Sequence, residues 1–323
     1  MRVKTERPKI DYKFYNPANT CEILYMEIFK KSKWEFNKRN NREEKKDWWY
    51  ECKNDFEKNI NLLFSKFIPE GLGEDEDKEN KDKYLQLVIK EFENLKIKWQ
   101  NFFDSVKKRN ERFLEDLRNC GFNVKPLTAR CPWRLVIGLG ASHPQETSMT
   151  LHHIYGIPYI PGSAVKGITR HWAVLKFAEE KAKLEGKSFE DSIKEIAKAL
   201  DDGNDLPLFL DNIEFKKVIE IFGTQKQVGK VIFMDAYPLD DINLKIDIMN
   251  VHYPDYYSGE KPPADWQNPK PVKFLTVENT TFQFYLISRE NVLLNIAEKL
   301  LKEALKGHGI GAKTSLGYGL FSL

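Results

Sequence analysis

The sequence predicts an α+β fold whose core reads strand, helix, strand, strand, helix, strand, with a large helical N-terminal region and further insertions. Two observations lead to this class. Between residues 20 and 120, apolar residues recur every three or four positions among charged ones, which is the period of a helix. After Pro126 the pattern changes to β-branched and aromatic residues in partial alternation, which is typical of a strand. The order matches the ferredoxin-like, split βαβ arrangement also found in RNA-recognition modules, with helices on one face of an antiparallel sheet and an open face for ligand.

Residues 1–122 are expected to form the helical region, packed on or inserted into the core. Within it, residues 71–83 are charged and almost without apolar side chains, so they are expected to form an exposed connection. Residues 123–323 are expected to form the ferredoxin-like domain.

The core elements follow from local periodicity and turn residues. Strands are expected at residues 128–137, 231–236, 244–251, 272–277, 281–288 and 316–323, and helices at 163–184, 189–200, 213–222 and 291–306. Residues 252–271 are rich in Pro, Gly, Asp and aromatic residues and fit no secondary-structure period. A connection of that length is uncommon in a compact domain unless it has a function, so a long functional or docking loop is expected there.

Charge is heavy and nearly balanced, since 51 lysines and arginines stand against 48 aspartates and glutamates. Any surface that attracts a polyanion must therefore be local. The four cysteines are irregularly spaced and form no C-x-x-C pair, so free thiols are expected and a zinc site is not. The apolar runs are too short for a membrane-spanning helix, and no apolar segment follows the charged start. These features lead us to expect a cytoplasmic protein with no membrane contact.

A glycine-rich segment, residues 307–319, stands close to the C-terminus. It looks superficially like the phosphate-binding G-x-x-x-x-G-K-[ST], but Ala312 separates Gly311 from Lys313 and too few residues follow for the helix that would receive the phosphate. The segment can instead present backbone amides, Lys313 and two hydroxyls, those of Thr314 and Ser315, to a phosphodiester. The alternative is a helix C-cap at Gly307 followed by a tight entry into the last strand, which needs only one or two glycines.

A second segment opens a helix after Pro161-Gly162. Lys166 and Arg170 are four residues apart and share a face with Ser163, near a helix N-terminus that favours anions. A phosphate would suit that arrangement. A capped core helix with two solvated cations explains the spacing equally well.

Together the two segments resemble the signature of the RAMP proteins, the RNA-binding family of CRISPR systems. The family's glycine-rich loop is matched by Gly309, Gly311, Gly317, Tyr318 and Gly319, and its helix-opening motif by residues 160–170, with Ala164 where serine is commoner.

Within that family, residues 134–142, 151–152, 158–161 and 252–257 are similar to the sixth-subunit branch of type III-B (Cmr) effector complexes. The likeness covers about residues 128–323. It implies a non-catalytic, RNA-binding structural subunit that holds guide RNA (crRNA) towards its 3′ end in RNA-guided antiviral defence. Other RAMP subunits and small helical subunits are the implied protein partners, and target RNA is a further candidate.

The residues expected to contact RNA come from four places in the chain. They are Ser163, Lys166, Arg170, Gly309, Gly311, Lys313, Thr314, Ser315, Tyr318, His152, Tyr256 and Tyr257. The two tyrosines belong to the long loop, which could stack nucleobases or serve as a rigid pad for a partner subunit.

Catalysis is the alternative function. A metal-independent endoribonuclease that processes guide-RNA precursors would use His152 or His308 as its acid–base group. Spacing fixes no partner for either histidine, and neither clustered carboxylates nor a His-Asp pair suggests a metal site. We therefore expect no catalytic residue, metal or cofactor.

Overall fold

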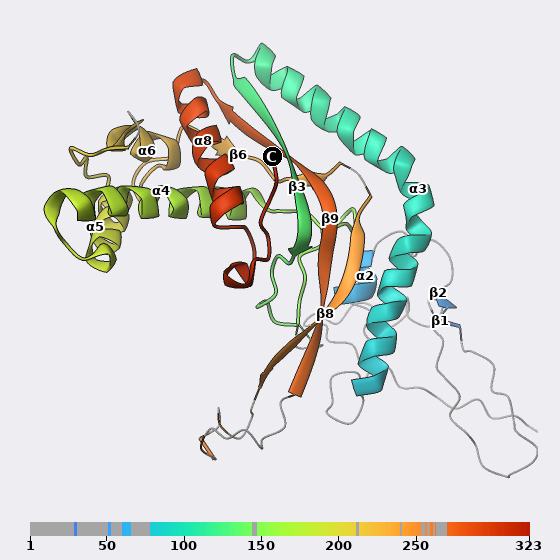
Figure 1. Cartoon of the computed structure of the whole chain (residues 1–323). Helices are drawn as coiled ribbons and strands as arrows, with labels where there is room; N and C mark the ends of the chain where they lie inside the picture. Colours follow the sequence, from blue (N-terminus) through green and yellow to red (C-terminus); the bar gives the residue numbers. More distant parts are fainter. Residues whose placement is uncertain are drawn as a thin grey trace, which may run out of the picture. The chain divides into compact units, whose positions relative to one another are not determined.

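The structure is a computed structural model, shown in Figure 1. It describes residues 29–30, 51–52, 60–65, 78–143, 147–210, 213–239, 241–252, 256, 259–260, 262 and 270–323. The chain divides into two compact units. Unit 1 comprises Met1–Ile97, Gly140–Ile157 and Ile246–Phe274, and unit 2 comprises Lys98–Leu139, Pro158–Lys245 and Leu275–Leu323. Both units combine segments from either side of residue 122, so the expected division there stays a prediction.

The main sheet is antiparallel and is built on β9 (Lys270–Ser288). One edge of β9 pairs with β3 (Asn123–Leu135). Two short strands, β6 (Ile232–Phe233) and β7 (Tyr237–Pro238), also pair with β9, as does β8 (Asn243–His252). The α+β class with an antiparallel sheet is therefore confirmed.

Three of the expected strands differ in the structure. Residues 272–277 and 281–288 lie in one continuous strand, because Glu278 and Thr280 continue the pairing with β3 around a bulge at Asn279. The expected final strand at 316–323 is reduced to a single bridge between Ser322 and Arg130. A 3-10 turn, η2 (Thr314–Leu316), and glycines at positive φ replace its first half, since extended pairing needs negative φ.

Four helices of unit 2 lie close to their expected positions. They are α4 (Gly162–Glu185), α5 (Phe189–Asp202), α6 (Phe215–Phe222) and α8 (Asn291–Gly307). A two-stranded ribbon of β4 (Phe209–Leu210) and β5 (Ile213–Glu214) precedes α6, where the sequence predicted helix from residue 213. Helix α5 starts at Ser188, whose hydroxyl accepts from the amide of Asp191 at 3.2 Å.

The core of unit 2 lies between α4, α8 and the sheet. Helices α4 and α8 contact each other, and α8 packs on β3 (Figure 1). Helix α8 supplies an apolar face spaced three and four residues apart, Leu293, Leu294, Ala297, Leu300, Leu301, Ala304 and Leu305, all buried. Phe282 and Phe284 of β9 meet Phe321 edge-on, which fixes the end of the chain against the sheet.

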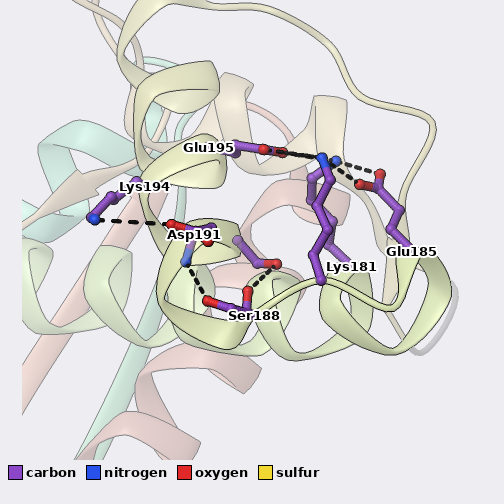
Figure 2. Close-up of polar contacts among 8 residues, drawn as sticks. Lys181, Glu185, Ser188, Asp191, Lys194 and Glu195 are labelled. Carbon is purple, nitrogen blue, oxygen red and sulfur yellow. Dashed lines mark hydrogen bonds and ion pairs between the residues drawn. The ribbon is translucent and has the colours of Figure 1, made fainter.

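Helices α4 and α5 are joined by an ion-pair cluster (Figure 2). The ammonium of Lys181, a buried side chain, lies 2.5 Å from Glu185 and 3.3 Å from Glu195. The hydrogen bond to Glu185 is the main cause that raises the pKa of Lys181. A buried lysine needs such partners, so the cluster holds α5 along α4.

The face of the sheet opposite α8 is less open than the sequence suggested. Tyr285 of β9 is half-buried, and its pKa is raised first by burial and then by Glu111 of α3 (Lys78–Asn119). The C-terminal part of α3 thus lies near that face.

The N-terminal region is only partly helical among the residues that are described. Phe29–Lys30 (β1) pairs with Glu51–Cys52 (β2), and α2 (Ile60–Ser65) is a short helix. Helix α3 begins at Lys78, so the predicted connection at 71–83 is helical from that residue on, and residues 71–77 lie outside the described part. Among the described helices, none is long and apolar enough to span a membrane.

Candidate nucleic-acid interface

The start of α4 is fixed by close packing on the sheet. A Cβ on Gly162 would collide with the carbonyl oxygen of Phe233 in β6, so only glycine fits. Its amide donates to Oδ1 of Asp235 at 2.7 Å. One anion at this helix end is therefore a carboxylate of the protein itself, and binding of a phosphate beside it stays a prediction.

The exposed face of α4 carries the three predicted residues. Ser163 is exposed, whereas Lys166 and Arg170 are partly buried. Nη2 of Arg170 lies 2.5 Å from Oδ1 of Asp201 in α5, so the charge of this arginine is partly offset. Among the described residues no ion pair involves Lys166, which leaves its ammonium available to a ligand.

Gly167 lies on the same exposed face of α4. It differs from Gly162 and from the glycines of the glycine-rich segment. It is exposed within the helix, its φ is ordinary, and a Cβ added to it would meet nothing within 4 Å. Glycine in a helix interior costs about 1 kcal/mol relative to alanine. Packing within unit 2 thus gives no reason for its lack of a side chain.

The glycine loop (residues 307–319) owes its glycines to its own packing. Gly309, Gly311, Gly317 and Gly319 all have positive φ. A Cβ on Gly319 would collide with the carbonyl oxygen of Ile310, and one on Gly311 with that of Val136. The amides of Ile310, Ala312 and Gly319 donate back to carbonyls of Gly319, Val136 and Arg134 at 2.7 to 2.9 Å. The number of glycines is therefore explained by tight packing of the loop on itself and on Arg134 and Val136, and is not by itself a sign of phosphate binding.

The exposed part of the loop is its turn at residues 311–316. Lys313 has φ 62°, a left-handed conformation that costs a non-glycine residue roughly 1–2 kcal/mol. Thr314 and Ser315 follow in η2, with Ser315 exposed and Thr314 partly so. The turn thus combines an ammonium with two hydroxyls, the set predicted from the sequence.

Two of the residues predicted to contact RNA are buried. Tyr318 is only 6% exposed, and its ring packs on Trp133 with centroids 5.0 Å apart. Gly309 is buried and lies against the carbonyl oxygens of Tyr318 and Gly319. Trp133 of β3 thus packs on Tyr318, and residues of the loop itself lie against Gly309, so contact of either residue with RNA stays a prediction.

The two segments meet in unit 2. The rings of His171 in α4 and His308 at the end of α8 lie 4.9 Å apart. A Cβ on Gly307 would lie 2.9 Å from Cη2 of Trp172, whose Nε1 donates to Glu303 at 3.1 Å. Partial desolvation, then His308 and then Arg170 lower the pKa of His171. The start of α4 and the glycine loop are thus neighbours on one side of the unit.

The other predicted residues belong to unit 1. Nδ1 of His152 accepts from the amides of Ile154 and Tyr155 at 3.2 Å each, and its ring stacks on Tyr155. This histidine therefore shapes a turn. Tyr256 is exposed, and Tyr257 lies outside the described residues.

Sequence reasoning missed the pairing of His171 with His308, the cap by Asp235, and Trp133. Trp133 interrupts the alternation of buried residues along β3 and is exposed at a bulge. The sequence carried no signal for this exposure, because Trp133 continues the apolar alternation of Leu127, Ala129 and Cys131. In the described part of the chain, no group of three His, Cys, Asp or Glu side chains could hold a metal ion.

The chain is similar to known proteins over much of this region. It is 42% identical over 219 residues to the CRISPR system Cmr subunit Cmr6 of Pyrococcus furiosus, which covers 58% of this chain and 64% of that protein. It is 26% identical to Cmr6 of Saccharolobus solfataricus over 75% of this chain and 70% of that one. A chain of the type III-B Cmr-β complex bound to cognate target RNA has a TM-score of 0.49 and 26% identity, covering 77% of this chain and 75% of that one.

This chain thus matches less than two thirds of the length of the P. furiosus protein. The model of the RAMP superfamily matches residues 127–322, which include the start of α4 and the whole glycine loop. The chain therefore belongs to the RAMP superfamily, and its relatives are Cmr6 proteins.

Proposed function

We propose that this chain is an RNA-binding, non-catalytic structural subunit of a type III-B CRISPR ribonucleoprotein, and that it holds guide RNA towards its 3′ end for RNA-guided antiviral defence. The observation that carries the proposal is the 4.9 Å contact of His171 with His308, which brings the exposed face of α4 beside the glycine loop. The sequence relatives named as Cmr6 subunits support the assignment to such a complex.

The proposed RNA surface is narrower than the set of residues predicted from the sequence. It consists of Ser163, Lys166, Gly167 and Arg170 on α4 and of Gly311, Lys313, Thr314 and Ser315 on the glycine loop. Cations, hydroxyls and an exposed glycine are the groups that contact a phosphodiester backbone. Lys313 supports the proposal further, because a left-handed lysine is less stable there than glycine, and strained residues cluster at functional sites.

The ferredoxin-like plan is part of the same proposal. Residue Ser322 bridges to β3, β3 pairs with β9, and β9 pairs with β6. This neighbour order supports a split βαβ core with α4 and α8 as its two helices.

In unit 1, Tyr256, Tyr257 and His152 are proposed as contacts to RNA or to a neighbouring RAMP or small helical subunit. The exposure of Tyr256 supports this role. His152 would contribute through the turn that its Nδ1 holds.

Salt-dependent binding tests the surface on α4 and the glycine loop. Single-stranded RNA is titrated against the full chain at about 50 to 200 mM salt, for wild type, Lys166→Ala and Lys313→Ala. Each variant should bind more weakly, and the negative slope of log K against log salt should become shallower by about 0.7 for each lost phosphate contact.

Lys194→Ala is the matched control, because this α5 lysine is exposed and pairs only weakly with Asp191 at 4.0 Å. It removes the same charge and should leave the slope unchanged. If Lys166→Ala and Lys313→Ala both bind like wild type, the proposed surface is wrong. In the assembled complex, photocrosslinks from the 3′ part of the guide should map to residues 163–170 and 311–315.

A metal-independent endoribonuclease is the second candidate. The close pair of His171 and His308 beside the proposed RNA surface favours it, since two imidazoles could act as acid and base. Incubation of labelled repeat RNA with the chain in EDTA distinguishes the two functions. Defined cuts that disappear in His308→Ala would establish the enzyme, and intact RNA would exclude it.

A further inference from the structure

Trp133 occupies an unusual position on β3. Along this strand Leu127, Ala129, Cys131 and Leu135 are buried, and continued alternation would bury residue 133 as well. A bulge between Cys131 and Arg134 shifts the register, so that Pro132 and Trp133 together face Asn279 of β9. Bulges re-aim side chains, and this one leaves Trp133 46% exposed.

The bulge is held in place by specific contacts. Asn279 has φ 49°, and its Oδ1 accepts from Nε and Nη2 of Arg130 at 3.1 and 2.6 Å. The thiol of Cys131 donates to the carbonyl oxygen of Trp133 at 3.7 Å. The exposure of the indole is therefore a fixed feature of the sheet.

The indole lies directly beside the glycine loop. A Cβ on Gly317 would come within 3.5 Å of the indole ring, and Tyr318 packs on it from the same loop. Arg134 places its guanidinium 5.5 Å from the ring centroid. Gly317 follows η2 directly, so the ring adjoins the turn that bears Lys313, Thr314 and Ser315.

We propose that Trp133 is a stacking platform for one unpaired nucleobase, whose phosphate lies against the turn at Lys313–Ser315. The inference rests on the proposed function, because it needs the glycine loop to face RNA. Exposed aromatic rings beside cations are the usual platforms for single-stranded nucleic acid, and each stacked base contributes to affinity without regard to sequence. Arg130 and Lys313 are neighbouring cations that favour a polyanion over an apolar segment of another protein, whereas Glu278, at 3.1 Å, partly offsets the charge of Arg134.

The experiment compares two strands on the full chain, an oligouridylate and an abasic oligonucleotide of the same length and phosphate number. Wild type should bind the oligouridylate at least about five-fold more tightly, the lower end of the stacking contribution. Trp133→Ala should abolish that preference while its affinity for the abasic strand stays unchanged. Trp133→Phe should restore most of the preference, which a merely structural role of the indole would not explain.

Phe189→Ala is the matched control, since Phe189 of α5 is also 46% exposed. It should keep the preference for bases. If Trp133→Ala keeps that preference, Trp133 is not a stacking platform. The same conclusion holds if the variant keeps the preference but no longer assembles with other subunits.

The two proposals can fail separately. If Lys313→Ala weakens binding of both strands and Trp133→Ala changes neither, the RNA surface stands and the platform falls. If wild type binds neither strand, both fall.

Discussion

The imidazole rings of His171 and His308 lie 4.9 Å apart and join the start of α4 to the glycine loop. Neither residue belonged to the set predicted to contact RNA. Their contact brings two separate sequence motifs together. Protonation of His171 is unfavourable, first because the ring is partly desolvated and then because His308 and Arg170 are neighbours.

The unfavourable protonation of His171 should make the free energy of unfolding depend on pH. The pKa of His171 is lowered in the folded chain from 6.5, so below about pH 6.5 the unfolded chain takes up this proton first. The free energy of unfolding should therefore fall as the pH drops through the folded pKa. Urea unfolding of wild type and His171→Gln at about pH 8 and pH 5 checks this. The variant should lose less stability on acidification, and equal losses would contradict the expectation.

Alanine at two motif glycines should have opposite effects on stability. Gly319→Ala places a Cβ against the carbonyl of Ile310 at positive φ, so it should destabilise the chain by about 2 kcal/mol or more. Gly167→Ala meets open space in a helix and should stabilise by about 0.5–1 kcal/mol. Denaturant midpoints measure both.

The same Gly167→Ala chain should bind RNA more weakly despite its higher stability, because the added methyl group separates the phosphate backbone from α4. Unchanged RNA affinity would show that Gly167 has no part in close approach.

Lys313→Gly should separate stability from binding. Glycine adopts φ 62° without strain, so the free energy of unfolding should stay level or rise by up to about 1 kcal/mol, while RNA affinity falls with the lost charge. Parallel unfolding and RNA titrations check both parts. A clear loss of stability would mean that contacts of the Lys313 side chain hold the loop.

Asp201→Asn should strengthen RNA binding. The exposed carboxylate of Asp201 pairs with Arg170, and removing a surface pair of this kind changes interaction energies by up to about 1 kcal/mol, or roughly five-fold in affinity. Asp202→Asn makes the same change in net charge at the neighbouring, exposed position. If both variants gain the same RNA affinity, the effect comes from net charge and Arg170 is not involved.

The sequence by itself determined the elements whose cause is local. The apolar spacing along α8 and the Pro-Gly start of α4 placed both helices within a few residues, and two motifs identified the superfamily that the match over residues 127–322 establishes.

The tertiary structure decided what depends on contacts between distant residues. Five glycines in one loop suggested an approaching phosphate, whereas a Cβ on Gly311 or Gly319 would collide with the carbonyl of Val136 or Ile310, so packing alone requires glycine at these two positions. Spacing could not reveal that Asp201 offsets the charge of Arg170 or that a bulge opposite Asn279 turns Trp133 outward. Each of these depends on a partner far away in the chain, and local periodicity carries no information about such a partner.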